Sequence, residues 1–573
     1  MGNRIGCVLH AADLEQERPI NPASLKVIPL GGLGEIGMNC LALELEGRRL
    51  VIDCGLTFDD RGLGVDVVHA DLSYLAEAPE RLEGIVVTHG HEDHVGAVPY
   101  LLEACGAAPV FAPPYALGVL KERLAQHEAG NPPGLQLFAM RPGDRLRLGP
   151  FEVEPYRVTH SMPDCTGLIV RTDQGVLVHS GDFKIEDDPT DGEGFDWDRL
   201  ARLRDEEGVR VLMSDSTNAL VEGSMGAERD VATRLREIVD EASGRVVVTL
   251  FASNIHRVRA LTEIARATGR KLCLFGRSLR MHAKIAADEG YLPGLEAVEI
   301  PIEMARSTPR DRLLVLATGT QGEPPAAFAR LANANHPELD IEPGDLVIHS
   351  ARIIPGCETR VYPLFDELAR RGIEVLWRRL DPGVHVSGHA HRAEQRRLIE
   401  ALRPDAFIPL HGTHMHMERH ADLARECGVE DVLVIGNGQV VEIDAGPLAV
   451  SGVVPTGRVH RERGRTLDER VLHDRSLLAS LGFAVVSAIV DVRGRPVAPL
   501  DILTRGVLHE DESQELLDDA CDEVHAALAR ARYHAERPDL DDIEAVAKRA
   551  LKRFFGKRMM KKPLCYAMIH RRP

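Results

Sequence analysis

Apolar and polar residues alternate in short runs along the first part of the chain, and glycine-rich turns separate the runs. The run NCLALELEG, residues 39–47, has the period of two that is typical of a half-buried β-strand. Acidic residues and histidines recur where such runs end, in a region predicted to be rich in strands. The predicted strands are residues 25–30, 39–47, 48–55, 84–89, 108–113, 151–160, 166–172 and 175–182, with a helix at 95–104.

The pattern changes near Ser224, where strands begin to alternate with helices. This alternation predicts a βαβ domain with a parallel sheet. Its predicted strands are residues 245–251, 271–276, 312–319, 345–350 and 373–378, and its helices are 254–269, 280–290 and 358–372. Histidine-bearing loops return after Trp377, so this α/β unit is predicted to be inserted into the first domain.

A stretch rich in glycine, proline and arginine precedes the last region of the chain. There a strand at 483–492 and helices at 512–532 and 539–555 predict a small α+β domain. The expected domains are an N-terminal extension (1–24), a strand-rich domain in two parts (25–222 and 378–447), the inserted α/β domain (223–377), a linker (448–466) and a C-terminal domain (467–573).

Composition bounds the class of protein. The 573 residues, 44% of them hydrophobic, suffice for several domains. No apolar run approaches the ~18 residues that cross a bilayer, and the polar N-terminus does not have the pattern of a signal peptide. We therefore expect a cytoplasmic protein with no membrane partner. The ten cysteines form no CxxC pair, which favours reduced thiols over a disulfide framework.

The formal net charge of −19 argues against a protein that coats nucleic acid nonspecifically, because phosphates repel a negative surface. A nuclease is not excluded, since bound metals and a local basic channel can invert the field. Charge therefore leaves the function open.

The glycines of GLGEIG, residues 32–37, have the spacing of a dinucleotide-binding fingerprint, and Asp53 follows at a suitable distance. Such a site needs a helix after the glycines, because the helix N-terminus binds the pyrophosphate. The strand-like LALELEG follows instead. We therefore predict a tight turn between two strands.

The densest candidate chemistry is THGHEDH, residues 88–94, directly after a predicted buried strand. His89 and His91 lie two apart on extended backbone and can project to the same side. Asp93 and His94 lie beyond the strand end and can reach a different point. Zinc bonds are only ~2.0–2.2 Å long and tetrahedral, so two metals explain these side chains better than one. A solvated polar loop would be the better interpretation of a single HxH.

Two adjacent metals need further ligands, usually including a bridging carboxylate. Other strand ends offer His160 in RVTHSMPD, Asp182 in LVHSGDFK and His411 in IPLHGTHMH. Taken singly, each also has a structural interpretation, as a satisfied histidine or, for Asp182, as a turn-capping residue. Their shared position at strand ends favours metal binding.

These motifs resemble those of a known superfamily. Asp53 in LVIDCG, the HGHEDH motif, His160, and Asp182 in HSGDFK are similar to the metal-site motifs of the metallo-β-lactamase superfamily. The corresponding fold is an αββα sandwich.

A second group of motifs resembles the β-CASP branch of that superfamily, whose members process nucleic acids. These motifs are Asp215 in MSDSTNA, His389 in HVSGHAH and His411 in PLHGTH. From about residue 25 onward, the order and the sequences of the motifs PLGGLGEIGMN, TLFASNIHRV, ATGTQGEP and IPGCE are similar to those of the ribonuclease J family. The implied architecture is the metallo-β-lactamase sandwich with an inserted β-CASP α/β domain and a small C-terminal α+β domain.

The resemblance implies a ribonuclease with two zinc ions per subunit, with Mn²⁺ or Mg²⁺ as assisting ions. Asp182 would bridge the zinc ions, and Asp53 would hold a ligand imidazole or the loop in place. One zinc would be held by His89, His91 and His160, and the other by Asp93, His94 and His411.

Two such metals, roughly 3.5–4 Å apart, lower the pKa of a shared water towards ~7 and clamp the scissile phosphate. The hydroxide would attack the phosphorus in line, which gives Asp93 and Asp182 a catalytic part through the metals. By resemblance, His389 protonates the leaving 3′ oxygen and Asp215 orients it. Phosphate binding alone is the alternative role for His389.

His385 and Ser387 share the HVSGHA segment with His389, and in the ribonuclease J family this segment helps to hold phosphate near the 5′ end. A pocket for a terminal monophosphate would favour 5′-to-3′ exonuclease action, beside endonuclease activity, in RNA maturation and decay. Ser253 and Asn254 are further phosphate or sugar candidates, together with the loop 319–322, although serine and glycine are ordinary turn residues.

Histidine at the position of His411 is typical of the RNA-processing members of the branch, so single-stranded RNA is the expected substrate. The basic run at 545–562 could contact RNA or an acidic partner. We favour the face of an amphipathic helix, whose inward residues would be Val546, Ala550, Leu551 and Phe554. The resemblance implies a homodimer or homotetramer through the C-terminal domain, and RNA-degradation proteins as partners.

Cys357 departs from the family pattern, in which asparagine is expected in the IPGxE segment. This departure concerns a contact of the inserted domain and not the metals. A hydrolase of lactonase or glyoxalase type could use the same HxHxDH loop, but it would lack the insert and HVSGHA. A noncatalytic RNA-binding relative would tend to lose metal ligands, and this chain keeps them all.

Overall fold

The computed structural model describes residues 24–59, 61–508, 513–560 and 562–572, so the predicted N-terminal extension lies outside it except for Ser24. The chain divides into two compact units. One comprises the chain up to Thr57 together with Val68–Val459, and the other comprises Phe58–Val67 together with the chain from His460 onward.

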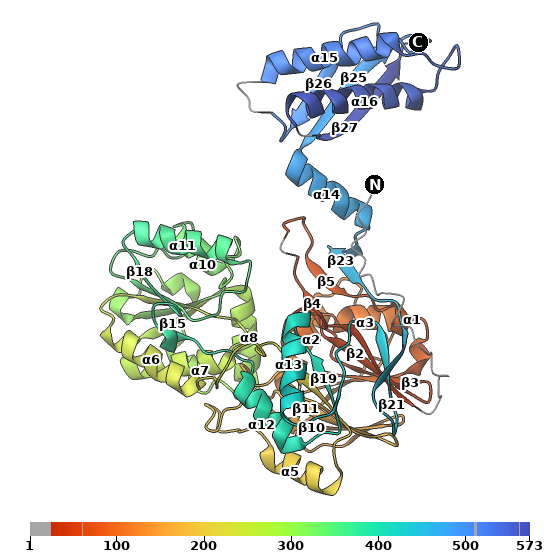
Figure 1. The fold of residues 1–573 in the computed structure, drawn as a ribbon. Coiled ribbons are helices and arrows are strands. Elements are labelled where there is room, and N and C mark those ends of the chain that lie inside the picture. The colour runs from red at the N-terminus through yellow and green to blue at the C-terminus, as the bar shows by residue number, and fades with distance from the viewer. Residues whose placement is uncertain (1–23, 60, 509–512, 561, 573) are drawn as a thin grey trace. The chain divides into compact units, whose positions relative to one another are not determined.

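Two β-sheets pack face to face in the first unit (Figure 1). Their facing side chains form one buried cluster that includes Leu43 and Ile52 from one sheet and Val170 and Met213 from the other. In order across the first sheet, the strands are β22 (Ala449–Val453), β21 (Gln439–Ile443), β1 (Leu25–Gly31), β2 (Cys40–Leu45), β3 (Arg48–Ile52), β6 (Leu82–Val86), β7 (Val110–Ala112) and β8 (Leu137–Ala139). The second sheet runs β20 (Asp431–Val432), β19 (Ala406–Leu410), β13 (Val211–Asp215), β12 (Gly175–His179), β11 (Thr166–Thr172), β10 (Phe151–Arg157) and β9 (Leu146–Leu148).

Helices cover the outer faces of this pair of sheets. On the first sheet they are α1 (Ser73–Ala76), α2 (Glu92–Val95), α3 (Val98–Cys105) and α4 (Pro114–Gln126), of which α4 contacts β7 and β8. On the second sheet they are α5 (Trp197–Glu206), α12 (Arg392–Leu402) and α13 (His414–Glu426), with α13 packed on β19. The αββα sandwich expected from the sequence is thereby confirmed.

Between β13 and α12 the chain builds the inserted α/β domain, yellow to green in Figure 1. Its sheet is parallel throughout, with the order β15 (Lys271–Phe275), β16 (Leu313–Ala317), β14 (Val246–Thr249), β17 (Leu346–His349) and β18 (Glu374–Trp377). One face carries α6 (Glu228–Glu241), α7 (Ile255–Thr268) and α8 (Arg277–Asp288), and the other carries α10 (Ala327–Ala332) and α11 (Glu358–Arg370). The short helix α9 (Leu295–Val298) contacts α7.

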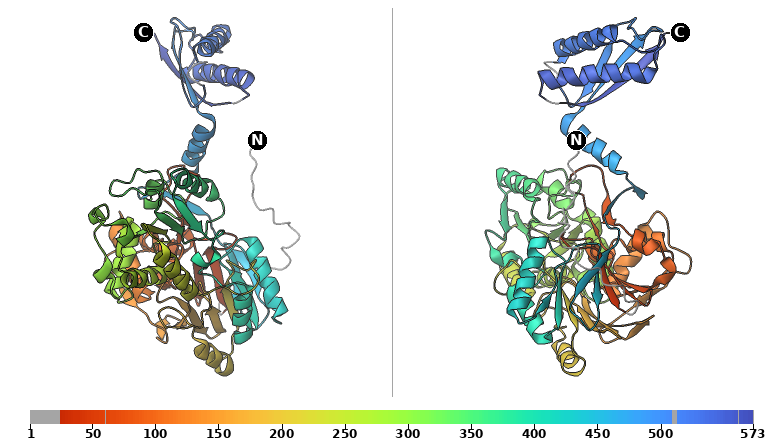
Figure 2. Two further views of the ribbon diagram at one scale, coloured as in Figure 1. Left: turned by 90° about the vertical axis from the view of Figure 1, so that its left-hand side faces the viewer. Right: turned by 45° about the vertical axis from the view of Figure 1, so that its right-hand side comes forward.

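The second unit contains a three-stranded sheet with the order β26 (Asp501–Arg505), β25 (Phe483–Val490) and β27 (Leu564–Arg571). Helix α14 (Glu469–Leu481) precedes this sheet in the chain, and α15 (Ser513–Arg530) and α16 (Leu540–Arg558) pack side by side on one face of it (Figure 2). The basic run falls largely on α16, where Ala550, Leu551 and Phe554 are buried and Val546 is half-buried. The amphipathic helix predicted for this run is therefore confirmed.

Local expectations differ from the structure at two places. The helix predicted at 95–104 is broken into α2 and α3, because the ring of Pro99 clashes with the carbonyl that a continuous helix would place four residues earlier. The stretch 448–466, expected as a linker, contains β22 and the short strands β23 (Arg458–Glu462) and β24 (Arg465–Thr466). Two further short strands are β4 (Leu56–Thr57) and β5 (Val67–Ala70).

The glycines of GLGEIG connect β1 to β2, which pair in antiparallel fashion, so the predicted turn between strands is confirmed. Helices long and apolar enough to cross a bilayer are absent from the described part of the chain. The cysteines within the described ranges are free thiols.

Candidate metal centre

The predicted metal ligands meet because their strands end at one edge of the sandwich. In the second sheet β10, β12, β13 and β19 all run in the same direction, since β10 and β12 are both antiparallel to β11, and β12, β13 and β19 are parallel. Their carboxyl ends bring together His160, Asp182, Asp215 and His411. The end of β6 in the other sheet delivers the histidines of the HGHEDH loop.

Three overlapping groups of these side chains each have their ligand atoms within 4.8 Å of one another. The groups are His89, His91, His160 and Asp182; Asp93, His94, Asp182 and His411; and Asp182, Asp215, His389 and His411. Asp182 belongs to all three.

The first group has the spacing of a metal shell. Nδ1 of His91 lies 3.0 Å from Nε2 of His89 and 3.2 Å from Nε2 of His160. The corners of a tetrahedron with bonds of ~2.0–2.1 Å lie about 3.4 Å apart. Three ring nitrogens so close together fit a shared cation.

The second group shares Asp182 with the first. Its Oδ2 lies 3.1 Å from Nε2 of His94 and 3.7 Å from Nε2 of His89. Oδ2 of Asp93 lies 3.4 Å from Nε2 of His411 and 3.8 Å from Nε2 of His94. The Asp182 carboxylate thus stands between two sets of donors, as a bridging ligand must.

Neighbouring acceptors fix the orientation of two rings. Nδ1 of His94 donates to Oδ2 of Asp53 at 2.8 Å, and Asp53 is itself held by the backbone N–H and hydroxyl of Thr88. Nδ1 of His160 donates to the carbonyl oxygen of Gly388 at 2.6 Å. Each ring therefore keeps the lone pair of Nε2 for the centre.

The titration of the histidines separates the two groups. Burial lowers the pKa of His91 to about 4 and those of His89 and His160 well below their usual value, so these rings are neutral. Burial also opposes the charging of His94 and His411, but Asp182 and Asp93 outweigh it and raise the pKa of both, to about 10 for His411. These raised pKa values reflect the negative potential of the Asp93 and Asp182 carboxylates, which a bound cation would compensate in place of the protons.

His389 and Asp215 form a hydrogen-bonded pair beside this cluster. Nδ1 of His389 lies 2.8 Å from Oδ2 of Asp215 and 3.8 Å from Oδ2 of Asp182. Burial lowers the pKa of His389, yet the carboxylates of Asp215 and Asp182 raise it overall. The imidazole is thereby favoured in its protonated form.

The structure also locates the weaker candidates. His385 is nearly buried and Ser387 is half-buried, both in the loop before α12 that carries His389. Asn254 is the N-cap of α7, and its Oδ1 accepts the backbone N–H of Arg257 at 3.0 Å. Cys357 is buried at the N-cap of α11, and its Sγ accepts a hydrogen bond from Arg360 of the same helix.

Sequence reasoning missed several residues that support the ligands. Asn39, which follows the GLGEIG turn, donates from Nδ2 to the carbonyl oxygen of Asp93 at 3.2 Å and lies 3.0 Å from Nε2 of His94. Thr88 and Gly388 act through Asp53 and His160 as described above. Asn39 lies two residues after the GLGEIG motif, whose glycine spacing suggests only a dinucleotide-binding fingerprint. A backbone carbonyl such as that of Gly388 gives no signal in a sequence.

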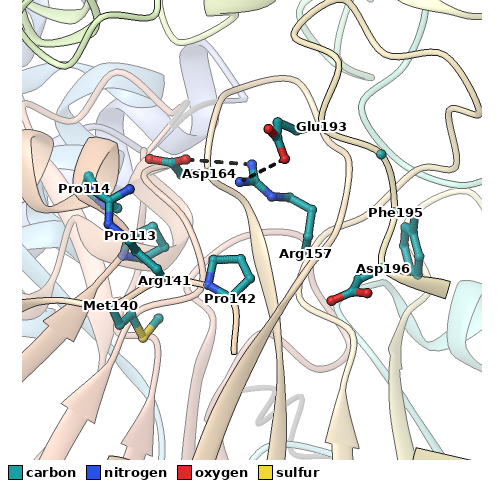
Figure 3. Close-up of a pocket in the computed structure, with 11 residues that line it drawn as sticks. Pro113, Pro114, Met140, Arg141, Pro142, Arg157, Asp164, Glu193, Phe195 and Asp196 are labelled. Carbon is teal, nitrogen blue, oxygen red and sulfur yellow. Dashed lines mark ion pairs between the residues drawn. The ribbon is translucent and has the colours of Figure 1, made fainter. Parts of the chain in front are cut away.

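One open pocket of the first unit is separate from these residues. It measures about 460 Å³, and Figure 3 shows Arg157 between Asp164 and Glu193 within it. The guanidinium lies 3.7 Å from Asp164 and 3.9 Å from Glu193, so its charge is already paired. The cluster borders a cavity of about 30 Å³, which has room for a water molecule.

Comparison with known proteins agrees with this geometry. Residues 48–217 match the family model described as "Beta-lactamase superfamily domain", and residues 243–368 match "Ribonuclease J, beta-CASP domain". Residues 379–434 match "Zn-dependent metallo-hydrolase RNA specificity domain", and residues 470–572 match "Ribonuclease J C-terminal domain". A sandwich of this kind with a β-CASP insert and a histidine–aspartate cluster defines a metal-dependent nuclease.

Comparison with individual proteins identifies the family within this class of metal-dependent nucleases. Ribonuclease J of Synechocystis is 38% identical over 85% of this chain and 76% of its own length. Ribonuclease J of Sinorhizobium meliloti is 34% identical over 95% of this chain and 97% of its own. The chain belongs to the ribonuclease J family and is a metal-dependent ribonuclease.

A solved structure supports the fold. The crystal structure of a protein of unknown function from Enterococcus faecalis superposes with a TM-score of 0.53 at 16% identity, and the match covers 73% of this chain and all of that chain.

Gly55 provides a test of the ligand loop. A Cβ at this position would lie 1.7 Å from the carbonyl oxygen of Asp93 and 2.0 Å from its carbonyl carbon. We expect Gly55→Ala to displace residues 93 and 94, to cost ~1–3 kcal/mol of stability and to slow RNA hydrolysis roughly 10–100-fold. Thermal unfolding and the rate of hydrolysis measure these effects.

The matched control is Gly452→Ala, because a Cβ there meets no atom within 4 Å. This variant should behave as the wild type. Unchanged stability and activity in Gly55→Ala would contradict the close contact.

Proposed function

We propose that this ribonuclease uses two zinc ions, degrades RNA from a 5′ monophosphate in the 5′-to-3′ direction and also cleaves internally, in RNA maturation and decay. The observation that carries the proposal is the position of Asp182 between two sets of donors, with the pair of His389 and Asp215 beside it. Mn²⁺ or Mg²⁺ would assist turnover.

One zinc would bind His89, His91 and His160, and the other would bind Asp93, His94 and His411, with Asp182 shared. The donor chemistry supports this choice, because imidazole with carboxylate suits zinc. Asp53 and Gly388 would hold the rings of His94 and His160 in the binding orientation.

When bound, the metals would supply a nucleophile from water near neutral pH and would offset charge on the scissile phosphate. His389 would give a proton to the leaving 3′ oxygen, since Asp215 keeps its ring oriented and favours the protonated form. Phosphate binding alone is the second role open to His389.

His385 and Ser387 would hold the terminal phosphate of the RNA, and Ser253 and Asn254 remain weaker candidates. A pocket that accepts one terminal phosphate beside the metal cluster would set the direction of trimming from the 5′ end. We further propose that the C-terminal domain supports a homodimer or homotetramer, on the grounds of family membership alone.

The substrate preference can be tested with RNAs of one sequence that carry a 5′ monophosphate, a 5′ triphosphate or a 5′ hydroxyl, and with the matched DNA. We expect mononucleotide release from the monophosphate RNA and a loss of about 10³-fold or more in Asp182→Asn, because the carboxylate that both metals need is removed. Chromatography of the products measures both results. Equal cleavage of DNA, or full activity in Asp182→Asn, would refute the proposal.

Metal content provides an independent test. Purified protein should retain about two zinc ions per chain after desalting, and Asp182→Asn should retain fewer than one, because it weakens both sites. Elemental analysis measures the ratio. Asp173→Asn, at an exposed turn, is the control and should keep the wild-type content. A wild-type content near one ion per chain would contradict the two-metal assignment.

The pH dependence tests the role of Asp215. Because the pKa of His389 is raised, its protonated form persists to higher pH, and a proton donor loses activity as the pH rises through that pKa. Asp215→Asn removes the raising charge, so the alkaline limb of the kcat profile should move to lower pH and kcat should fall roughly 10²-fold. A limb that stays in place in this variant would exclude His389 as the proton donor.

A further inference from the structure

The proton of the His385 ring is fixed by an arginine of the inserted domain. Nη1 of Arg257 lies 3.0 Å from Nδ1 of His385. A guanidinium can only donate, so Nδ1 accepts and the ring proton is on Nε2. Burial and the charge of Arg257 lower the pKa of His385 well below its usual value, which keeps the ring neutral. The one ring nitrogen left for a ligand is therefore a donor.

The hydroxyl of Ser387 is constrained in the same sense. Its Oγ accepts a hydrogen bond from Nδ2 of Asn218 at 3.0 Å and another from the backbone N–H of His389 at 3.2 Å. Both lone pairs of the oxygen are then occupied. Only the O–H is left, so Ser387 can act towards a ligand only as a hydrogen-bond donor.

The orientation of the Asn218 amide follows from two neighbours. Its Nδ2 also donates to the carbonyl oxygen of His389 at 2.9 Å, and its Oδ1 accepts from Nη1 of Arg352 at 2.9 Å. A carbonyl can only accept and a guanidinium can only donate, so both contacts require the same orientation. Asn218 is almost fully buried, which makes this orientation the one that leaves no polar atom unpaired.

We propose that Arg257 and Arg352 are positioning residues that make His385 and Ser387 obligate hydrogen-bond donors, Arg352 acting through Asn218, and that this selects RNA with a 5′ phosphate over RNA with a 5′ hydroxyl. The inference rests on the proposed function, in which His385 and Ser387 hold the terminal phosphate. Phosphate oxygens accept from both donors. A 5′ hydroxyl brings a proton of its own, for which neither side chain retains an acceptor.

Arg257 is itself held in place. Its Nη2 lies 2.7 Å and 2.8 Å from the two carboxylate oxygens of Glu228, and its Nη1 donates to the carbonyl oxygen of Ser350 at 2.9 Å. All three residues belong to the inserted domain, whereas His385 follows it in the chain. Removal of Arg257 alone would leave a buried, unpaired carboxylate, so its variant needs a compensating change at Glu228.

The experiment compares kcat/KM on two RNAs of one sequence, one with a 5′ monophosphate and one with a 5′ hydroxyl. Arg352 is exposed, so Arg352→Met should fold normally. We expect its monophosphate-to-hydroxyl ratio to fall about tenfold, the factor that corresponds to 1.4 kcal/mol, while the rate on hydroxyl RNA stays within about twofold. Arg352→Lys, which retains a donor, should restore much of the ratio.

Arg378→Met is the matched control, because Arg378 is an exposed arginine whose charge acts on Arg352. It removes the same charge without a hydrogen bond to Asn218, and its ratio should stay at the wild-type value. The combined change Arg257→Met and Glu228→Met should lower the ratio as Arg352→Met does, with circular dichroism as the check on folding.

The possible results distinguish a failure of the proposed function from a failure of the inference about Arg257 and Arg352. A wild-type protein without preference for the monophosphate RNA would refute the proposed function itself. If the wild type has the preference and Arg352→Met keeps the full ratio, the inference is overturned. An equal fall in Arg378→Met would also overturn it, because loss of charge and not loss of donor orientation would then be the cause.

Discussion

Crowding of negative charge at one point is the constraint on which the rest of this structure depends. The carboxylates of Asp182 and Asp215 are buried, and Asp182 lies close both to Asp215 and to the half-buried Asp93. Such groups remain together in a poorly hydrated interior only when positive charge compensates them. His389, whose pKa is raised by Asp215 and Asp182, supplies part of this charge in its protonated form. In a metal-dependent ribonuclease bound cations supply the rest, and the hydrogen bonds around the cluster keep lone pairs directed inward.

The two-sheet fold makes this crowding possible without strain on the individual strands. The strands contribute these side chains at or shortly after their ends: Asp215 is the last residue of β13, and His411 directly follows β19. His411 and Asp53 both adopt a positive φ, of 48° and 59°, directly after their strands. The core holds the sheets rigid behind these turns, so donors from distant parts of the chain keep fixed separations.

Much of the fold could be predicted from the sequence, and so could the residues that the structure brings together at the candidate metal centre. The period of two in strands and the position of polar residues after apolar runs depend on neighbours in the chain, and the HGHEDH motif is local. The amphipathic pattern of α16, which buries Leu551, is also local in the sequence.

The break between α2 and α3 was missed because the helical pattern outweighed the single proline. Arg257 and Arg352 could not be found, since their partners lie 128 and 134 residues away and ordinary surface arginines look the same. The strands within 448–466 depend in part on pairing along β21, which composition does not report.

The hydrogen bond from His160 to the carbonyl of Gly388 spans 228 residues. During synthesis on the ribosome, His160 therefore emerges and can fold well before the group that orients it exists. The last candidate ligand, His411, comes later still, after the whole inserted domain has been made. A nascent chain thus carries an incomplete centre for most of its translation, and the nuclease cannot be assembled until nearly three quarters of the polypeptide, up to residue 411 of 573, is available.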